Sequence, residues 1–396
     1  MKRLVLTEDR FSRFELIDWW DQRRVAQARV LVAGAGALGN EVVKNLALLG
    51  VTQLVLVDMD VVETSNLSRS PLFRPADAGR AKVDAAAESA RSLYPDMRVQ
   101  PLRANVVHDL GLGLFRWADV VIGALDNREA RLSLNRSSYR VGRPWIDGAI
   151  ESLSGVARVF VPPEGPCYEC TMSARDWQLL ESRRSCSLLN SQLQEQGKVP
   201  TTPTTSSVIA AIQCQEAVKL LHGQPTLAGA GFVFDGLNHD SYVTRYQRSA
   251  DCLSHDPLEH LERVPRGVAE VTVREALAWG RRTLGPTAGL EFGRELLAGL
   301  DCPQCGGSER LFRPLSQVGE AQGLCPACGA RRAPRLMHGV HGDEDFLDLT
   351  LAQLGVPPWD IVVARAGEQT MGFELAGDQA RVLGPVHAGP TQEERT

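Results

Sequence analysis

The residues with the clearest chemical potential begin with three glycines, Gly34, Gly36 and Gly39, which follow an apolar run at residues 28–33. Glycines at such a turn let the backbone approach a phosphate, and the start of the next helix supplies N–H donors. Asp58 comes nineteen residues after Gly39, where a carboxylate accepts hydrogen bonds from ribose hydroxyls. These residues alone fit NAD as well as they fit ATP.

Polar side chains behind Asp58 favour ATP over a nicotinamide cofactor. Arg69 and Lys82 supply cations that neutralise a polyphosphate, and Asn66 can hydrogen-bond the same phosphates. Asp126, just after an apolar run at 119–123, can hold Mg²⁺, which binds one or two carboxylates together with phosphate oxygens. The predicted nucleotide site therefore combines the glycines with these polar residues: Asp58, Asp60, Asn66, Arg69, Lys82, Asp126 and Asn127.

Four cysteines in the last third of the chain have the spacing of a structural metal site. Cys302 and Cys305 form one pair, Cys325 and Cys328 form the other, and nineteen residues separate the two pairs. This spacing is typical of a zinc ribbon, in which four thiolates surround one closed tetrahedral ion. We therefore predict a structural Zn²⁺ here.

A second metal site is predicted from residues that are far apart in the sequence. Cys167 and Cys170 form a CxxC pair, and Cys252 and His255 have the same two-residue gap with a zinc ligand at each end. Three cysteines and one histidine would complete a tetrahedral site. The alternative is a lost zinc site that leaves Cys252 and His255 merely exposed.

The two remaining cysteines differ in their surroundings. Cys214 lies within a predicted helix at 204–221, and we expect it to be a small buried apolar residue. Cys186 lies in a polar segment close to Arg183 and Arg184, whose charges lower its pKa and favour the thiolate. Cys186 is therefore the candidate nucleophile, with an incidental loop cysteine as the alternative.

The elements that must position these residues alternate between strand and helix. Short apolar runs at 28–33, 54–57 and 119–123 predict buried parallel strands. Helical patterns at 40–49, 79–93 and 128–140 separate or follow them. The predicted fold is α/β, a doubly wound, mostly parallel sheet of Rossmann-like type. Later strands, predicted at 156–161, 232–234 and 242–246, extend it as a mixed sheet.

Composition narrows the classes of function. The chain has 396 residues, 43% hydrophobic content and a net charge of −5, as expected for a globular protein of more than one domain. No basic face is indicated, so nucleic acid is not an expected partner. No apolar run approaches the roughly 20 residues of a membrane helix or forms a signal peptide, and we expect a cytoplasmic protein with no membrane partner.

The order of the motifs carries a family resemblance. Arg10-Phe11-Ser12-Arg13-Phe14 precedes the glycine loop, and the run from Asp58 to Arg69, then Lys82, then Asp126-Asn127 follow it. Over about residues 8–255 this order resembles the ubiquitin-activating-enzyme superfamily, which includes ThiF- and MoeB-type activators of sulfur carriers for thiamine and molybdopterin synthesis. The resemblance implies ATP-dependent adenylation of the C-terminal glycine of a small ubiquitin-like protein.

The resemblance also implies roles for individual residues. Asp58 would bind ribose, Asp126 would hold Mg²⁺, and the phosphates would be bound by Asn66, Arg69 and Lys82. Arg13 would reach the ATP of the opposite subunit in a homodimer. Cys186 occupies the position of the thioester cysteine, which attacks the acyl-adenylate and releases AMP. One departure is Ser70, which stands where the family usually has glutamine.

The expected domain organisation is an adenylation domain at 1–255, with a crossing segment at 171–205 that contains Cys186. A helical connector at 256–300, the zinc ribbon at 301–330, a small module at 331–388 and a disordered tail at 389–396 would follow. Related activating enzymes dock a conjugating enzyme on a C-terminal domain, and the same use is hypothesised here. Deleting 256–396 should then spare adenylation and impair transfer.

Other functions compete with a thioester-forming enzyme. A sulfur-carrier adenylyltransferase would stop at the acyl-adenylate, and Cys186 and the C-terminal extension argue against that reading. A third candidate is a small-molecule adenylating or tRNA-modifying relative, whose expected basic surface the chain lacks. A non-catalytic scaffold would not need Arg69, Lys82 and Asp126 together. A role in antiphage defence is suggested by resemblance alone.

Overall fold

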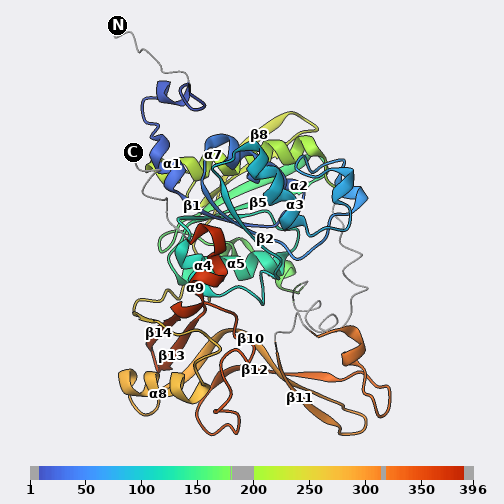
Figure 1. Ribbon diagram of the computed structural model, residues 1–396, viewed down its shortest axis with the longest axis vertical. Helices are drawn as coiled ribbons and strands as arrows, with labels where there is room; N and C mark the ends of the chain where they lie inside the picture. Colours follow the sequence, from blue (N-terminus) through green and yellow to red (C-terminus); the bar gives the residue numbers. More distant parts are fainter. Residues whose placement is uncertain (1–8, 179, 181–199, 314–317, 388–396) are drawn as a thin grey trace.

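The computed structural model describes residues 9–178, 180, 200–313 and 318–387, which form two sheets joined through a shared interface (Figure 1). The first sheet is built from β1 Arg29–Ala33, β2 Gln53–Val57, β3 Arg98–Leu102, β4 Val120–Gly123, β5 Trp145–Glu151, β6 Ser154–Phe160, β7 Ala230–Asp235 and β8 Asp240–Arg245. Its helices are α1 Gln22–Gln27, α2 Ala37–Leu49, α3 Lys82–Leu93, α4 Leu112–Trp117, α5 Arg128–Arg140 and α7 Pro203–His222.

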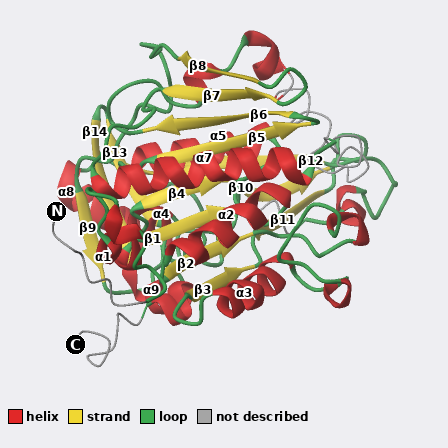
Figure 2. Cartoon of the chain, turned by 90° about the horizontal axis from the view of Figure 1, so that it is seen from above, coloured by secondary structure: helices red, strands yellow, loops and turns green. Residues whose placement is uncertain are grey.

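Within the described residues, the first sheet has the order β3-β2-β1-β4-β5-β6-β7-β8, which is followed in Figure 2. Strands β3 to β5 in this order are parallel, and β6, β7 and β8 add antiparallel strands. The predicted doubly wound, mostly parallel α/β sheet is confirmed. In such sheets ligands bind outside the carboxyl ends of the strands where the order reverses, here between β1 and β4.

Alternating side chains of each central strand pack on opposite faces of this sheet. Val30 and Val32 of β1 belong to the core beneath α2, α3 and α7, whereas Leu31 and Ala33 belong to the core on the opposite face. Burial on both faces explains the uninterrupted apolar runs seen in the sequence. Helix α7 packs against α2 and strands β5 and β6, and it buries Cys214 as predicted.

The second sheet has the order β11-β10-β13-β14-β9 among the described residues, and β12 also pairs with β10. Its elements are β9 Leu261–Val264, α8 Val273–Leu284, β10 Gly289–Asp301, β11 Ser308–Arg313, β12 Ala333–Val340, β13 Ile361–Ala366, β14 Gln369–Leu375 and α9 Gln379–Leu383. The C-terminal α/β extension that carries the four-cysteine cluster is thus present as predicted.

The expected helical connector at 256–300 is wrong. Only α8 in this range is an α-helix, and β9 and β10 are strands of the same sheet as β11 to β14. Short apolar runs do not by themselves distinguish a helix from a strand. Residues 289–301 form β10, which pairs with β11, β12 and β13, and this pairing decides the structure of the segment. The connector, ribbon and module are therefore parts of one sheet.

The segment that contains α9 returns to the first sheet and lies beside α4 (Figure 1). Its buried side chains complete the core of that sheet. Leu383 of α9 and Val386, each at most 2% exposed, belong to the same core cluster as Leu31 and Val55, on the face that carries α4. Trp359 is 2% exposed and belongs to this cluster as well. The expectation that 256–396 can be removed without harm to the first domain is therefore revised, because its removal would expose this core.

Polar contacts also stabilise the interface between the C-terminal region and the first sheet. The Asp360 carboxylate accepts a hydrogen bond from the Leu112 backbone N–H at the start of α4 (2.8 Å) and pairs with Arg294 (3.2 Å). Arg116 of α4 pairs with Glu374 of β14 at 3.0 Å, and Glu374 is almost fully buried.

In the part of the chain that the structure describes, no helix has the length and hydropathy needed to cross a bilayer.

Candidate functional site

The glycine loop connects β1 to α2 at the carboxyl edge of the sheet. Gly34 has φ +100°, a conformation that other residues rarely adopt, and a Cβ at Gly39 would lie 1.9 Å from the Gly34 carbonyl oxygen. A Cβ at Gly36 would meet nothing within 4 Å, so the backbone there faces open space. The loop is tight where it packs against α2 and open where a phosphate would approach, which fits a nucleotide.

Asp58 follows β2 and fixes the loop from the neighbouring strand. Its carboxylate accepts hydrogen bonds from the backbone N–H groups of Ala35 (2.7 Å) and Asp60 (2.8 Å). Burial raises the pKa of Asp58, and the nearby Lys82 charge opposes this rise. The carboxylate is therefore directed at the glycine loop, where the sequence predicted a ribose acceptor.

Lys82, the first residue of α3, lies among three carboxylates. Its Nζ donates to Asp60 Oδ2 at 2.8 Å, and its side chain is only 11% exposed. Burial alone would lower the pKa of Lys82, but the charges of Asp58, Asp60 and Asp126 outweigh burial and raise it. Three carboxylates against one ammonium leave a local excess of negative charge, so a bound triphosphate would require further cations.

The loop between β2 and α3 carries Asn66 and Arg69. Asn66 uses its side-chain oxygen to accept from the Glu63 N–H (2.9 Å), which leaves its amide N–H₂ as the group that could donate to a phosphate. Arg69 is half-buried and donates to the Ser65 carbonyl at 2.7 Å. The buried Ser70 hydroxyl has no hydrogen-bond partner within the described residues.

Asn40 is a site residue that the sequence analysis missed. Its fully buried amide donates to the Ala35 and Gly36 carbonyls (2.7 and 3.1 Å) and accepts from the Leu72 N–H at 3.0 Å. It therefore ties the glycine loop to the segment that carries Arg69. The sequence contained one signal for this role, since Asn40 is a polar residue on the first turn of an otherwise apolar helix face.

Asp126 lies three residues beyond β4, at the start of α5. Its side chain is exposed, and Asn127 donates to it at 3.2 Å. Asn127 also caps α5 by accepting from the Ala130 N–H at 2.8 Å, so its oxygen has a structural role. An exposed carboxylate facing Lys82 is chemically suited to Mg²⁺, which keeps several waters and phosphate ligands.

One predicted catalytic residue is not brought to this site within the chain, and another lies outside the described residues. Arg13 lies in an N-terminal segment whose Phe11 packs against Gly50, at the far end of α2. Because α2 has 13 residues, that end is about 20 Å from the glycine loop. Cys186 lies outside the described residues, as does most of the predicted crossing segment and the predicted disordered tail.

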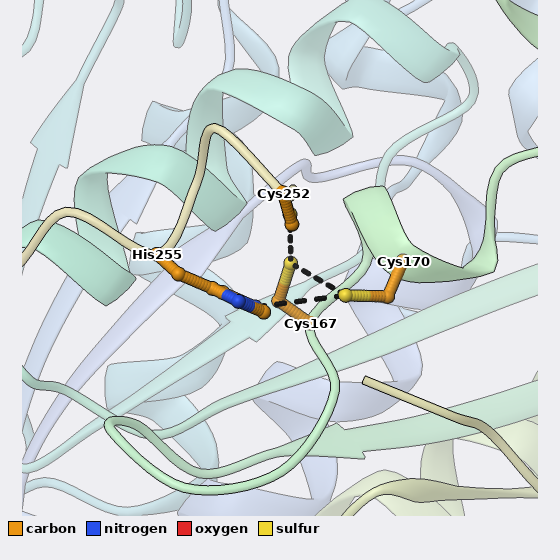
Figure 3. Close-up of side chains that lie close together, drawn as sticks. All are labelled: Cys167, Cys170, Cys252 and His255. Carbon is orange, nitrogen blue, oxygen red and sulfur yellow. Dashed lines mark hydrogen bonds between the residues drawn. The ribbon is translucent and has the colours of Figure 1, made fainter. Parts of the chain in front are cut away.

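The structure brings Cys167, Cys170, Cys252 and His255 together, with their ligand atoms within 4.8 Å of one another (Figure 3). Cys167 Sγ is 3.8 Å from Cys170 Sγ and 3.5 Å from Cys252 Sγ, and Cys170 Sγ is 3.5 Å from His255 Nε2. A tetrahedral zinc with Zn–S bonds of about 2.3 Å places its sulfurs about 3.8 Å apart. The donor set and spacing therefore fit zinc.

Buried partners hold this cluster in shape. Asn135 accepts from the Tyr168 N–H (2.9 Å) and donates to Ser254 (2.9 Å), and Ser254 donates to Glu169 (2.5 Å). The Tyr139 ring stacks on His255 with centroids 4.7 Å apart. Burial, then the Arg248 charge, lowers the pKa of His255, which favours the neutral ring that binds metal. These contacts join the two halves of the cluster.

The second cluster lies in the ribbon formed by β10, β11 and β12. Cys302 Sγ is 3.5 Å from Cys328 Sγ, and Cys305 Sγ is 3.6 Å from Cys325 Sγ. All four sulfurs lie within 4.8 Å of one another. Four thiolates in this closed arrangement match a structural zinc ribbon, as the spacing predicted.

Comparison with known proteins gives several similar sequences. The chain is 35% identical over 258 residues to the SAMP-activating enzyme E1 of Haloferax volcanii, covering 62% of this chain and 87% of that protein. It is 31% identical over 238 residues to the molybdopterin-synthase adenylyltransferase of Salmonella typhimurium, covering 59% and 90%. It is 31% identical over 237 residues to the sulfur carrier protein adenylyltransferase of Thermus thermophilus, covering 58% and 83%.

A solved structure supports the fold. E. coli MccB with ATP aligns at a TM-score of 0.52 and 21% identity, covering 63% of this chain and 74% of that chain. Residues 9–254 match the ThiF family, so the second sheet lies beyond the matched region. This match spans more than half of the sequence and confirms the resemblance to ubiquitin-activating-enzyme-like proteins. The chain belongs to the ThiF family.

Proposed function

We propose that the protein uses ATP to adenylate the C-terminal carboxylate of a small ubiquitin-like protein. The observation that carries this proposal is the convergence of Lys82 with Asp58, Asp60 and Asp126 beside the glycine loop. An NAD site does not need a lysine and a separate exposed carboxylate at this edge. Relatives named as adenylyltransferases and as an activating enzyme support the same reaction.

The reaction joins two anions, and the positively charged groups of the site would reduce the repulsion between them. A carboxylate oxygen of the substrate bonds to the α-phosphorus as the bond to the bridging oxygen of pyrophosphate breaks. Arg69 and Lys82 would neutralise the phosphates and the leaving pyrophosphate. Asp126 would hold Mg²⁺, which supplies further positive charge to the phosphate oxygens. No general base is needed, because a carboxylate is already ionised at neutral pH.

Both metal clusters would hold Zn²⁺ in a structural role, since all four ligand positions of each are filled by protein side chains. A homodimer would account for Arg13, because its segment packs at the end of α2 away from its own glycine loop and it could then act on a partner's ATP. After adenylation, Cys186 would attack the acyl-adenylate to form a thioester and release AMP, and the cargo would pass to a conjugating enzyme. The support for these later steps is the sequence motif and the added C-terminal sheet.

The alternative is a sulfur-carrier adenylyltransferase that stops at the acyl-adenylate. Two of the relatives carry names of that kind, and one is named for activation of SAMP. The two readings share the adenylation step and differ in whether Cys186 becomes acylated.

Pyrophosphate–ATP exchange with a ubiquitin-like cargo tests the shared step. Lys82→Met should reduce exchange by at least tenfold, because a phosphate-neutralising cation is lost. Lys44→Met, which removes a lysine paired with Glu41 on α2, should not change it. Exchange at background with every tail-bearing cargo would refute adenylation, whereas undiminished exchange in Lys82→Met would refute the role given to Lys82.

Non-reducing gel electrophoresis separates the two readings. A thiol-sensitive adduct of protein and cargo that disappears in Cys186→Ala supports the thioester enzyme. Exchange without any adduct supports the sulfur-carrier adenylyltransferase.

A further inference from the structure

Arg131 connects two strand ends beside the proposed nucleotide site. It lies in the first turns of α5, and its side chain is 11% exposed. Its Nε donates to Asp147 of β5 at 3.0 Å, and its Nη2 donates to the carbonyls of Leu125 and Gly148. One guanidinium therefore bridges the segment after β4 and the middle of β5.

This bridge begins where strand pairing stops. The last paired residues of β4 and β5 are Gly123 and Asp147, and the Ala124 N–H bonds to Ala33 of β1. Beyond that point the Leu125 carbonyl is held by Arg131. Because the peptide unit is planar, fixing this carbonyl also fixes the direction of the Asp126 N–H and Cα.

Asp126 is consequently held from both sides, while its carboxylate stays exposed. Arg131 bonds the carbonyl of the peptide before it, and the next residue, Asn127, is anchored by its side chain, which accepts from the Ala130 N–H at 2.8 Å. Within the described part of the chain, the carboxylate accepts one long hydrogen bond, from the Asn127 amide at 3.2 Å. The groups on both sides of Asp126 are anchored, and its carboxylate oxygens remain available to a cation.

A fully buried carboxylate keeps Arg131 in place. Asp147 is 0% exposed and is shared by Arg131 (3.0 Å) and Arg158 (2.5 Å). Burial opposes the charge on Arg158, but Asp147, together with Tyr246 and Tyr168, outweighs burial and raises the pKa of Arg158. Two guanidinium groups around one buried carboxylate form a charge-assisted network whose geometry is fixed by β5 and β6.

We propose that Arg131 is a positioning residue that sets the Asp126 carboxylate in the geometry required for a divalent cation with ATP. The proposal rests on the proposed adenylation function and adds Arg131 and Asp147 to its machinery. Groups that orient a metal-binding carboxylate typically change metal affinity by about 10–100-fold when they are removed.

The first test is ATP binding by titration calorimetry over a range of Mg²⁺ concentrations. Arg131→Gln should raise the Mg²⁺ concentration needed for half-maximal ATP binding by about tenfold, and Arg131→Lys should restore part of the loss. Arg128→Gln is the matched control, since Arg128 lies on the same helix and pairs with Asp176 outside this network. Folded Arg131→Gln with unchanged Mg²⁺ dependence would overturn the proposal.

A double substitution separates positioning from a general structural role. In an Asp126→Asn background, Arg131→Gln should change Mg²⁺ dependence little further, because its target carboxylate is already absent. Equal effects of Arg131→Gln in both backgrounds would contradict action through Asp126. If Arg131→Gln does not fold, Arg131→Lys carries the same comparison. Absence of pyrophosphate exchange in the unmodified protein would instead refute the proposed function.

Discussion

Two buried amides, Asn40 and Asn135, hold the loops that carry the predicted ligands. Asn40 joins the glycine loop to the segment after Arg69, and Asn135 joins the Cys167–Cys170 turn to Ser254. Each uses both its donor and its acceptor, as a buried amide must to avoid a desolvation cost. Neither side chain takes part in the proposed chemistry, yet both fix the positions of groups that do.

His255 gives a prediction at the residue scale. Because His255 supplies one of four ligand atoms, His255→Ala should leave the chain with one bound zinc where the two clusters would otherwise hold two. His255→Cys should retain both zinc ions, since cysteine is also a zinc ligand. Elemental analysis of the purified protein measures zinc per chain. His260→Ala is the control, and two zinc ions retained in His255→Ala would contradict the assignment.

At the scale of elements, helix starts are fixed by local hydrogen bonds that the sequence encodes. Asn127, Thr202 and Thr272 cap α5, α7 and α8 with their side chains. Thr272 and Glu275 form a capping box in which each side chain bonds the other's backbone. Helix α8 packs over the second sheet, so its start affects the core of that sheet.

The ionisation of Glu275 makes the stability of the capping box at the start of α8 depend on pH. The hydrogen bond from the Arg266 side chain, then the one from the Thr272 N–H, lowers the pKa of Glu275 to about 2, from 4.5. A lowered pKa in the folded state means that the carboxylate stabilises the protein above pH 4.5, and that this contribution disappears as the pH falls towards 2.

Glu275→Gln should therefore lower the free energy of unfolding at neutral pH by up to about 1 kcal/mol. The difference between Glu275→Gln and the unmodified protein should shrink as the pH falls below 4.5. Urea unfolding at several pH values measures it, with the exposed Glu262→Gln as control. A difference that grows in acid would contradict the prediction.

At the scale of the whole molecule, three residues of the C-terminal region, Trp359, Leu383 and Val386, are part of the first domain's core. Leu383 and Trp359 pack with side chains of the first sheet, and Asp360 bonds the start of α4. The additional sheet lies beyond the ThiF match, but its return segment covers a face of the matched domain. Function and stability of the two parts are consequently linked.

Leu383→Ala tests this link. Leu383 is 1% exposed, and its truncation should cost about 3 kcal/mol because a cavity remains in the shared core. Unfolding should stay a single transition with a lower midpoint, followed by fluorescence and circular dichroism. Leu324→Ala, at a position that is 47% exposed, should stay within about 0.5 kcal/mol. Independent unfolding of the second sheet would show that the two parts are separate.

Local patterns in the sequence determined much of the candidate site and the first sheet. The glycine loop, the acidic residues after β2 and β4 and the cysteine pairs are short motifs whose chemistry requires particular residues at fixed spacing. The central strands were predictable because strands buried on both faces leave uninterrupted apolar runs. Family membership followed from the order of these motifs.

Tertiary structure decided the features that depend on contacts between distant residues. It brought Cys252 and His255 to Cys167 and Cys170, closing an alternative that the sequence left open. It made residues 289–301 a strand, because pairing with three partners outweighs an ambiguous local pattern. It also placed Leu383 in the first core and Arg131 between two strand ends. Such contacts have no period or spacing in the sequence, so only the folded chain reveals them.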